Sequence, residues 1–253
     1  MRRVLLAALL GVGVMAAGRG EAAEIKVLTA GAFKEVLLAT LPGFEQATGH
    51  KVTVDNATVG VLTKRIEGGE AFDVAVMGPA AIEQLTQKGK FASGTQATLA
   101  RVGVGVVVKD GTPKPDISSV DAFKRSLLAA KSIAYIDPAG GGSSGIYLAK
   151  LLQQLGIAEA VNAKAKLIPG GAVADHIAKG EAELGLHQIS EILQVKGVSL
   201  VGPLPAEIQN YTVYAAGISA TPKDAAAARA LLDRLAGPET AALLKAKGME
   251  PAS

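Results

Sequence analysis

The feature that most constrains the fold is a repeated order of short apolar strand, glycine-containing loop and amphipathic helix. Residues 25–28 predict a strand that ends in a loop at 29–32. Helical spacing then places Phe33, Val36 and Leu37 on one face of a helix. Further strands are expected at 51–54, 73–77, 102–108, 132–136, 166–168, 183–187 and 213–218. Strands that alternate with helices predict an α/β fold in which helices cover parallel sheets.

Two sheets are expected rather than one, because two long β-branched segments can carry the chain between lobes. These segments lie near Val102 and Val213. The first lobe is predicted to comprise residues 23–102 together with 216–253, and the second lobe residues 103–215. The apolar residues that fill both cores are mainly Ala, Val, Leu and Ile, since aromatic residues make up only 4% of the chain.

The N-terminus has the order of features that is typical of a secretory signal peptide. Met1-Arg2-Arg3 is positively charged, residues 4–17 are apolar without charge, and small residues surround Glu21. The apolar segment is shorter than the roughly 20 residues that a membrane-spanning helix needs. Residues 1–22 are therefore predicted to be removed during export to the periplasm.

Charge and cysteine content exclude several functions. Loss of residues 1–22 would remove three arginines and one glutamate, which leaves a nearly neutral chain without a clustered basic face for nucleic acid. The chain contains no cysteine, so disulfides, thiol catalysis and cysteine metal sites are absent. The three histidines are not at metal-ligand spacing, and neither a metal nor a cofactor is expected.

Four loops follow predicted strands and precede predicted helices. Ligands in α/β sheets bind beyond the carboxyl ends of strands, where the free amides and partial positive charge of helix N-termini favour anions. The candidate ligand-binding residues in these loops are Ala30, Gly31, Ala32, Thr58, Val59, Ser143, Ser144, Gly145, Tyr147 and Gln188.

Each loop also has a purely structural interpretation. Serine and threonine before a helix often serve only as N-caps, which contribute about 1 kcal/mol to helix stability. The segment 140–145 has three glycines followed by two serines, more than a turn requires, and favours binding more strongly. It lacks the Gly-Lys-Ser/Thr ending of a phosphate-binding loop and the GxSxG spacing of a serine hydrolase.

Several segments, in order along nearly the whole chain, together resemble the periplasmic molybdate-binding proteins and their relatives. These are Val27–Phe33, Arg65–Gly69 with Phe72–Val74, Ile136–Pro138 with the glycine loop, Gly180–Gly185, Leu204–Asn210, Tyr214–Ile218 and Lys247–Pro251. The resemblance implies a type II periplasmic binding-protein fold with two α/β lobes and two hinge crossings. It also implies a monomer that captures a small anion between its lobes for the permease of an ABC importer.

This chain departs from the pattern of the molybdate-binding members, which use serine hydroxyls, backbone amides and a tyrosine. The position of the first serine is occupied by Ala30 or Gly31, the tyrosine position by Gln188, and the acidic residue that follows is Glu191. Fewer hydroxyls and less side-chain bulk favour a larger anion, such as an organic carboxylate.

The chain also resembles the periplasmic aconitate isomerases, which belong to the same family of binding proteins. That resemblance implies the isomerisation of a tricarboxylate by transfer of a proton between two carbons, which needs a positioned acid or base. His187 is the first candidate base because of its intrinsic pKa, and Glu191 the second. Tyr147 and Arg65 are weaker candidates, and a packed histidine without catalytic function is the structural alternative for His187.

Overall fold

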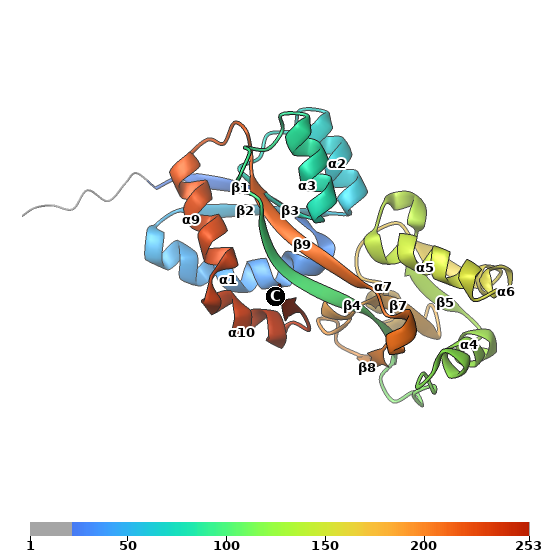
Figure 1. The fold of residues 1–253 in the computed structure, drawn as a ribbon. Helices are drawn as coiled ribbons and strands as arrows, with labels where there is room; N and C mark the ends of the chain where they lie inside the picture. Colours follow the sequence, from blue (N-terminus) through green and yellow to red (C-terminus); the bar gives the residue numbers. More distant parts are fainter. Residues whose placement is uncertain (1–21, 253) are drawn as a thin grey trace, which may run out of the picture.

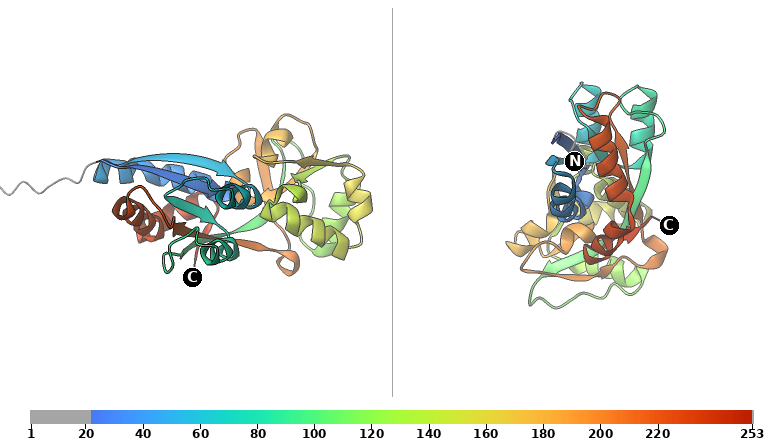
Figure 2. Two further views of the ribbon diagram at one scale, coloured as in Figure 1. Left: turned by 90° about the horizontal axis from the view of Figure 1, so that it is seen from above. Right: turned by 90° about the vertical axis from the view of Figure 1, so that its left-hand side faces the viewer.

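Two α/β lobes joined by two long strands make up the molecule in the computed structural model (Figure 1), which describes residues 22–252. The strand β4 (Ala97–Lys109) leaves the first lobe and continues into the second, and β9 (Tyr211–Ile218) returns beside it. Turned views place both ends of the described chain in the first lobe (Figure 2). The predicted signal peptide lies almost entirely outside the described residues.

The first lobe is built on a sheet with the order β2-β1-β3-β9-β4. The strands β1, β2 and β3 are parallel, and helices cover the sheet. The elements are β1 (Glu24–Ala30), η1 (Gly31–Phe33), α1 (Lys34–Thr48), β2 (Lys51–Ala57), α2 (Val59–Glu67), β3 (Val74–Met77), α3 (Pro79–Gln87), α9 (Ala225–Ala236), α10 (Pro238–Ala246) and β10 (Glu250–Pro251).

The second lobe continues the sheet from β4 in the order β4-β7-β5-β6, with β8 also paired to β4. Its elements are α4 (Val120–Ala129), β5 (Ile133–Ile136), η2 (Pro138–Gly140), α5 (Ser143–Gln154), α6 (Ala158–Asn162), β6 (Ala165–Ile168), α7 (Val173–Ala178), β7 (Leu184–Gln188), α8 (Ile189–Ile192), β8 (Val198–Pro203) and η3 (Ala206–Ile208). No helix in the described range 22–252 is both long enough and apolar enough to cross a membrane.

The two-lobed α/β prediction is confirmed, and parallel strands occur in both lobes as predicted, but the strands that cross between the lobes pair antiparallel. The strand β9 is antiparallel to both β3 and β4, and β4 is antiparallel to β7 and β8. A chain that crosses to the second lobe and then returns must reverse its direction, so its two crossing strands pair antiparallel. Because β4 takes part in both lobes, one continuous path of strands connects them.

Buried apolar side chains form separate cores in the two lobes. Along β4 the side chains pass from one core to the other within two residues, since Val102 packs in the first lobe and Val104 in the second. On the returning strand, Tyr214 and Ala215 already pack in the first core. Full burial of a large aliphatic or aromatic side chain contributes roughly 1.5–3 kcal/mol. The first lobe thus has one apolar core and the second lobe has two apolar clusters, and Ile189 of α8 also packs against the core of the first lobe.

Candidate functional site

A cavity of about 270 Å³ lies between the lobes, at the carboxyl ends of strands from both. The strands β1 and β2 end there from the first lobe, and β5, β6 and β7 end there from the second. None of the lining residues is a lysine or an arginine. The lining residues are Ala30, Gly31, Ala32, Asn56, Ala57, Thr58, Val59, Val61, Ile136, Gly142, Ser143, Ser144, Pro169, Gly170, Gly171, His187, Gln188, Glu191 and Tyr214.

The glycine-serine loop places the start of α5 at this cavity. Gly142 is the N-cap residue, and no side chain caps the helix. The first amide groups of an α-helix have no partner within the helix and carry partial positive charge. Ser143 and Ser144 lie in this first turn and line the cavity, and Ser144 is almost completely buried. The end of α5 therefore offers amide and hydroxyl donors suited to an anion.

Gly145 has a packing function that its sequence neighbours do not share. It does not line the cavity, and a Cβ atom at this position would overlap the carbonyl oxygen of Ile136. The absence of a side chain lets α5 pack directly against the end of β5. The structure thus separates Gly145 from the two serines with which the sequence grouped it.

Thr58 caps α2 and also bridges the lobes. Its hydroxyl accepts a hydrogen bond from the amide of Val61 at 3.3 Å and donates to the carbonyl of Gly140 in the second lobe at 2.5 Å. The amide of Gly60 donates to the carbonyl of Gly141 at 3.3 Å. A Cβ atom on Gly60 would lie 2.9 Å from the Cα atom of Gly141, so this close contact requires glycine.

A second contact between the lobes lies at the other side of the cavity. The hydroxyl of Ser190, in α8, donates to the carbonyl of Ala32 at 3.1 Å. Together with the Thr58 contact, it joins the two lobes beside the cavity.

Gln188 is the N-cap residue of α8 and belongs to a buried hydrogen-bonded group. Its side-chain nitrogen donates to the hydroxyl of Thr212 at 2.9 Å. Its side-chain oxygen accepts a hydrogen bond from the hydroxyl of Tyr214, also at 2.9 Å. Since both partners lie on β9, this amide ties the second lobe to the returning strand at the cavity floor.

His187 and Glu191 form a close pair at the cavity, with 3.2 Å between Nε2 of the histidine and Oε2 of the glutamate. Burial lowers the pKa of His187 to about 3 and raises the pKa of Glu191 to about 8. Both shifts favour the neutral form, so an uncharged pair is expected at neutral pH. The Nδ1 atom of His187 is buried without a hydrogen-bond partner among the described residues.

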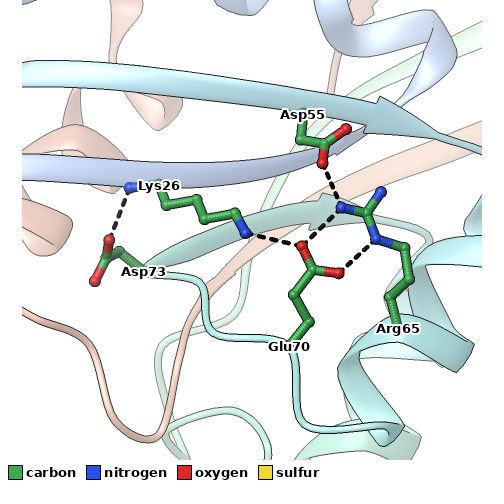
Figure 3. Close-up of polar contacts among 5 residues, drawn as sticks. All are labelled: Lys26, Asp55, Arg65, Glu70 and Asp73. Carbon is green, nitrogen blue, oxygen red and sulfur yellow. Dashed lines mark hydrogen bonds and ion pairs between the residues drawn. The ribbon is translucent and has the colours of Figure 1, made fainter.

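Two weaker candidates from the sequence lie away from the cavity. Tyr147 donates its hydroxyl to the carbonyl of Ile208 within the second lobe and does not line the cavity. Arg65 lies in an ion-pair network in the first lobe, where it contacts Asp55 and Glu70 (Figure 3). The structure therefore gives both side chains contacts that stabilise one lobe.

The charged side chains around Arg65 form several ion pairs with one another. The Nε atom of Arg65 lies 2.5 Å from a carboxylate oxygen of Glu70, and Lys26 contacts the same carboxylate at 2.8 Å (Figure 3). Hydrogen bonds from Arg65 and Lys26 lower the pKa of Glu70 to about 2. These charges are thus matched within the first lobe, where they hold α2 and the loop after it to β1 and β2.

Besides Ala57, Val61, Ile136 and Gly142, three further parts of the lining were missing from the sequence prediction. The loop 169–171 follows β6 and contains two glycines, so the rule that selected the other loops could have selected it. Asn56 precedes the predicted Thr58 loop. Tyr214 reaches the cavity from the middle of β9, and no local pattern signals this.

No group of three or more His, Cys, Asp or Glu side chains in the range 22–252 is arranged to hold a metal ion. The polar groups at the cavity are amides, hydroxyls, one imidazole and one carboxyl group.

Two α/β lobes around a cavity lined by neutral donors give this chain the fold of the type II periplasmic binding proteins. The sequence profile described as "Bacterial extracellular solute-binding protein" matches residues 25–250. This chain belongs to that family, which confirms the family predicted from the sequence.

Similar proteins include an aconitate isomerase and molybdate-binding proteins. The chain is 34% identical over 233 residues to an aconitate isomerase from Pseudomonas sp., covering 90% of this chain and 87% of the relative. It is 30% identical over 248 residues to the molybdate-binding protein ModA of Azotobacter vinelandii, covering 94% of each. The solved periplasmic molybdate-binding protein of Azotobacter vinelandii aligns with a TM-score of 0.77 and 23% identity, covering 90% of this chain and all of the other.

Proposed function

We propose that this chain is exported to the periplasm, captures a small organic anion in the inter-lobe cavity and delivers it, as a monomer, to the permease of an ABC importer. The observation that carries the proposal is the uncapped start of α5, which opens with Ser143 and Ser144 into a cavity without basic side chains. Preorganised neutral donors can bind an anion in a site that excludes water.

The size of the cavity favours an organic anion over a tetrahedral oxyanion. Its volume of about 270 Å³ equals that of roughly nine water molecules at about 30 Å³ each. An oxyanion such as molybdate has five non-hydrogen atoms and would leave much of this space to water. A carboxylate with a longer carbon skeleton would fill it and reach donors from both lobes.

A thermal-shift screen tests the proposal with molybdate, sulfate, phosphate, citrate, cis-aconitate and trans-aconitate. A ligand at about 100 times its Kd adds roughly 2.7 kcal/mol of stability, which raises the Tm of a domain this size by roughly 5–10 °C. We expect such a shift with at least one organic anion and a smaller shift with molybdate. Unchanged Tm values with all six anions would contradict the proposal.

A second candidate function is isomerisation of a tricarboxylate on the same scaffold. The neutral His187–Glu191 pair at the cavity favours it, and the Pseudomonas relative carries the name aconitate isomerase. In such a reaction a proton leaves one carbon of the substrate, the double bond shifts, and a proton returns at another carbon. The net charge of the substrate does not change, so one group that takes up the proton and returns it balances the reaction.

Within this candidate, the local environments favour Glu191 over His187 as the base. A general base works best when its pKa lies near the operating pH. Burial raises the pKa of Glu191 to about 8, whereas burial lowers the pKa of His187 to about 3. We therefore assign proton transfer to Glu191. His187 would hold the carboxyl group of Glu191 in position through their contact.

Incubation of cis-aconitate or trans-aconitate with the protein in deuterated water separates capture from catalysis. An isomerase interconverts the two and incorporates deuterium, and Glu191→Gln should lower the rate 10²- to 10⁴-fold, the usual contribution of a general base. If the wild-type protein catalyses neither exchange nor isomerisation, capture remains the function. Turnover that persists in the Glu191→Gln variant would remove Glu191 from the mechanism.

A further inference from the structure

The carboxyl group of Glu191 lies directly against the first lobe, although the residue belongs to α8 of the second lobe. A Cβ atom built on Gly31 would lie only 2.5 Å from Oε1 of Glu191. The space that a side chain at position 31 would occupy is therefore filled by the carboxyl group. Glycine at this position is what lets Glu191 approach the loop after β1 and line the cavity.

The charged and titratable groups around Glu191 do not include a close cation. His187, on β7, is its nearest titratable neighbour at 3.2 Å and is too buried to carry charge easily. Tyr214, on β9, directs its hydroxyl to Gln188. Glu191 also lines an outer hollow of about 380 Å³, where the charged residues Lys34, Glu35 and Asp175 lie. In that hollow one lysine faces three carboxyl groups, so Lys34 is not a dedicated partner for Glu191.

An anion in the cavity makes the ionised form of Glu191 still less favourable. Burial already raises the pKa of this carboxyl to about 8, and a second negative charge nearby disfavours ionisation further. A protonated carboxyl, in contrast, offers an O–H donor. Hydrogen bonds to a charged acceptor are shorter and stronger than those between neutral groups.

We propose that Glu191 holds the captured anion as a neutral carboxylic acid that donates a hydrogen bond to it, so that binding at alkaline pH takes up a proton from solution. This inference rests on the proposed function and specifies how the site recognises its ligand. The balance is one proton from water to the carboxylate of Glu191 for each anion bound. At neutral pH the proton is already in place, and little net uptake accompanies binding.

Isothermal titration calorimetry in buffers of different ionisation enthalpy measures this uptake, with trans-aconitate and molybdate as the two probes. With a pKa of about 8 in the free protein, we expect about 0.9 proton taken up per anion at pH 9 and about 0.1 at pH 7. The apparent Kd at pH 9 should exceed that at pH 7 about tenfold, because only the protonated fraction is competent.

Two variants test whether the proton is taken up by the carboxyl group of Glu191 or by a carboxylate of the outer hollow. Glu191→Gln keeps an N–H donor that cannot ionise, so its Kd should be the same at pH 7 and pH 9 and its proton uptake zero. Glu35→Gln removes a carboxylate from the outer hollow and should keep the wild-type uptake at pH 9. Circular dichroism and the Tm of each variant check that it is folded.

The possible failures are distinguishable. If neither probe binds the wild-type protein at pH 7, this inference is overturned, whereas the proposed function is overturned only if the other four anions of the thermal-shift screen also fail to bind. If a probe binds but no proton is taken up at pH 9, capture stands and the inference is overturned. The wild-type measurement alone decides this point, even if Glu191→Gln does not fold. Uptake that persists in a folded Glu191→Gln variant would also overturn the inference, because another group would then supply it.

Discussion

Replacement of Glu191 by glutamine is expected to stabilise the folded protein at neutral pH, although the residue faces the binding cavity. The pKa of the carboxyl is about 8 in the folded state, against 4.5 as an ordinary value for the unfolded chain. Between these values the folded state retains a proton that the unfolded state releases, so stability falls as pH rises from 4.5 to 8. Glutamine does not titrate, so the variant keeps its stability as the pH rises through this range.

The pKa shift of Glu191 sets the expected change in the free energy of unfolding. One pKa unit corresponds to about 1.36 kcal/mol, so the destabilisation by Glu191 is on the order of 3 kcal/mol at pH 7 and below about 1 kcal/mol at pH 5. Since 16% of the side chain is exposed, contact with water reduces these values, and they are upper estimates. Glu191→Gln should therefore gain about 2 kcal/mol over the wild-type protein between pH 5 and pH 7.

Urea denaturation of both proteins at the two pH values measures this difference. The lowered pKa of His187 has the opposite effect, since stability from this residue is lost as pH falls from 6.5 towards 3. His187 is present in both proteins, so a comparison at each pH isolates Glu191. Glu83→Gln, at an exposed position of α3, removes one carboxylate without burial and should change stability by less than about 0.5 kcal/mol.

A single result would refute the reasoning about this carboxyl group. If Glu191→Gln is less stable than the wild-type protein at pH 7, and by the same amount at pH 5, then Glu191 is ionised and stabilised by a partner in the folded state. The proposal that it donates a proton to the ligand would then lose its physical basis.

Three further predictions concern the loops and the N-terminus. Replacing Ser143 and Ser144 together with alanine should weaken anion binding by about 1–3 kcal/mol with little change in Tm, measured by calorimetry, because hydrogen bonds to a charged ligand are lost. Gly60→Ala should weaken binding at least severalfold, since its Cβ meets the backbone of Gly141 and opposes closure; small-angle scattering should show a more open molecule. Mass spectrometry of periplasmic protein should find an N-terminus at Ala23 or within a few residues, and an intact Met1 would contradict export with cleavage.

Local patterns predicted much of the fold because the signals are short-range. Alternation of apolar strands with amphipathic helices located most elements to within a few residues, including the long strand near Val102 and the strand near Val213. The β8 strand, Val198–Pro203, was not predicted, since it is only half-buried and lacks a strong apolar pattern. Strand direction was also mispredicted, because pairing of β9 with β3 and β4 joins residues more than 100 positions apart.

The sequence by itself determined which loops could meet a ligand, because ligand sites in such sheets lie where strands end and helices begin. Only the tertiary structure decided what each loop residue does. It committed Thr58 to a contact between lobes, placed Gly145 against β5, and turned Tyr147 towards Ile208. It also buried Glu191 beside Gly31, 160 positions away in the chain, and so set its pKa. Burial and the distance between charges depend on which segments fold together, and no local pattern in the sequence contains that information.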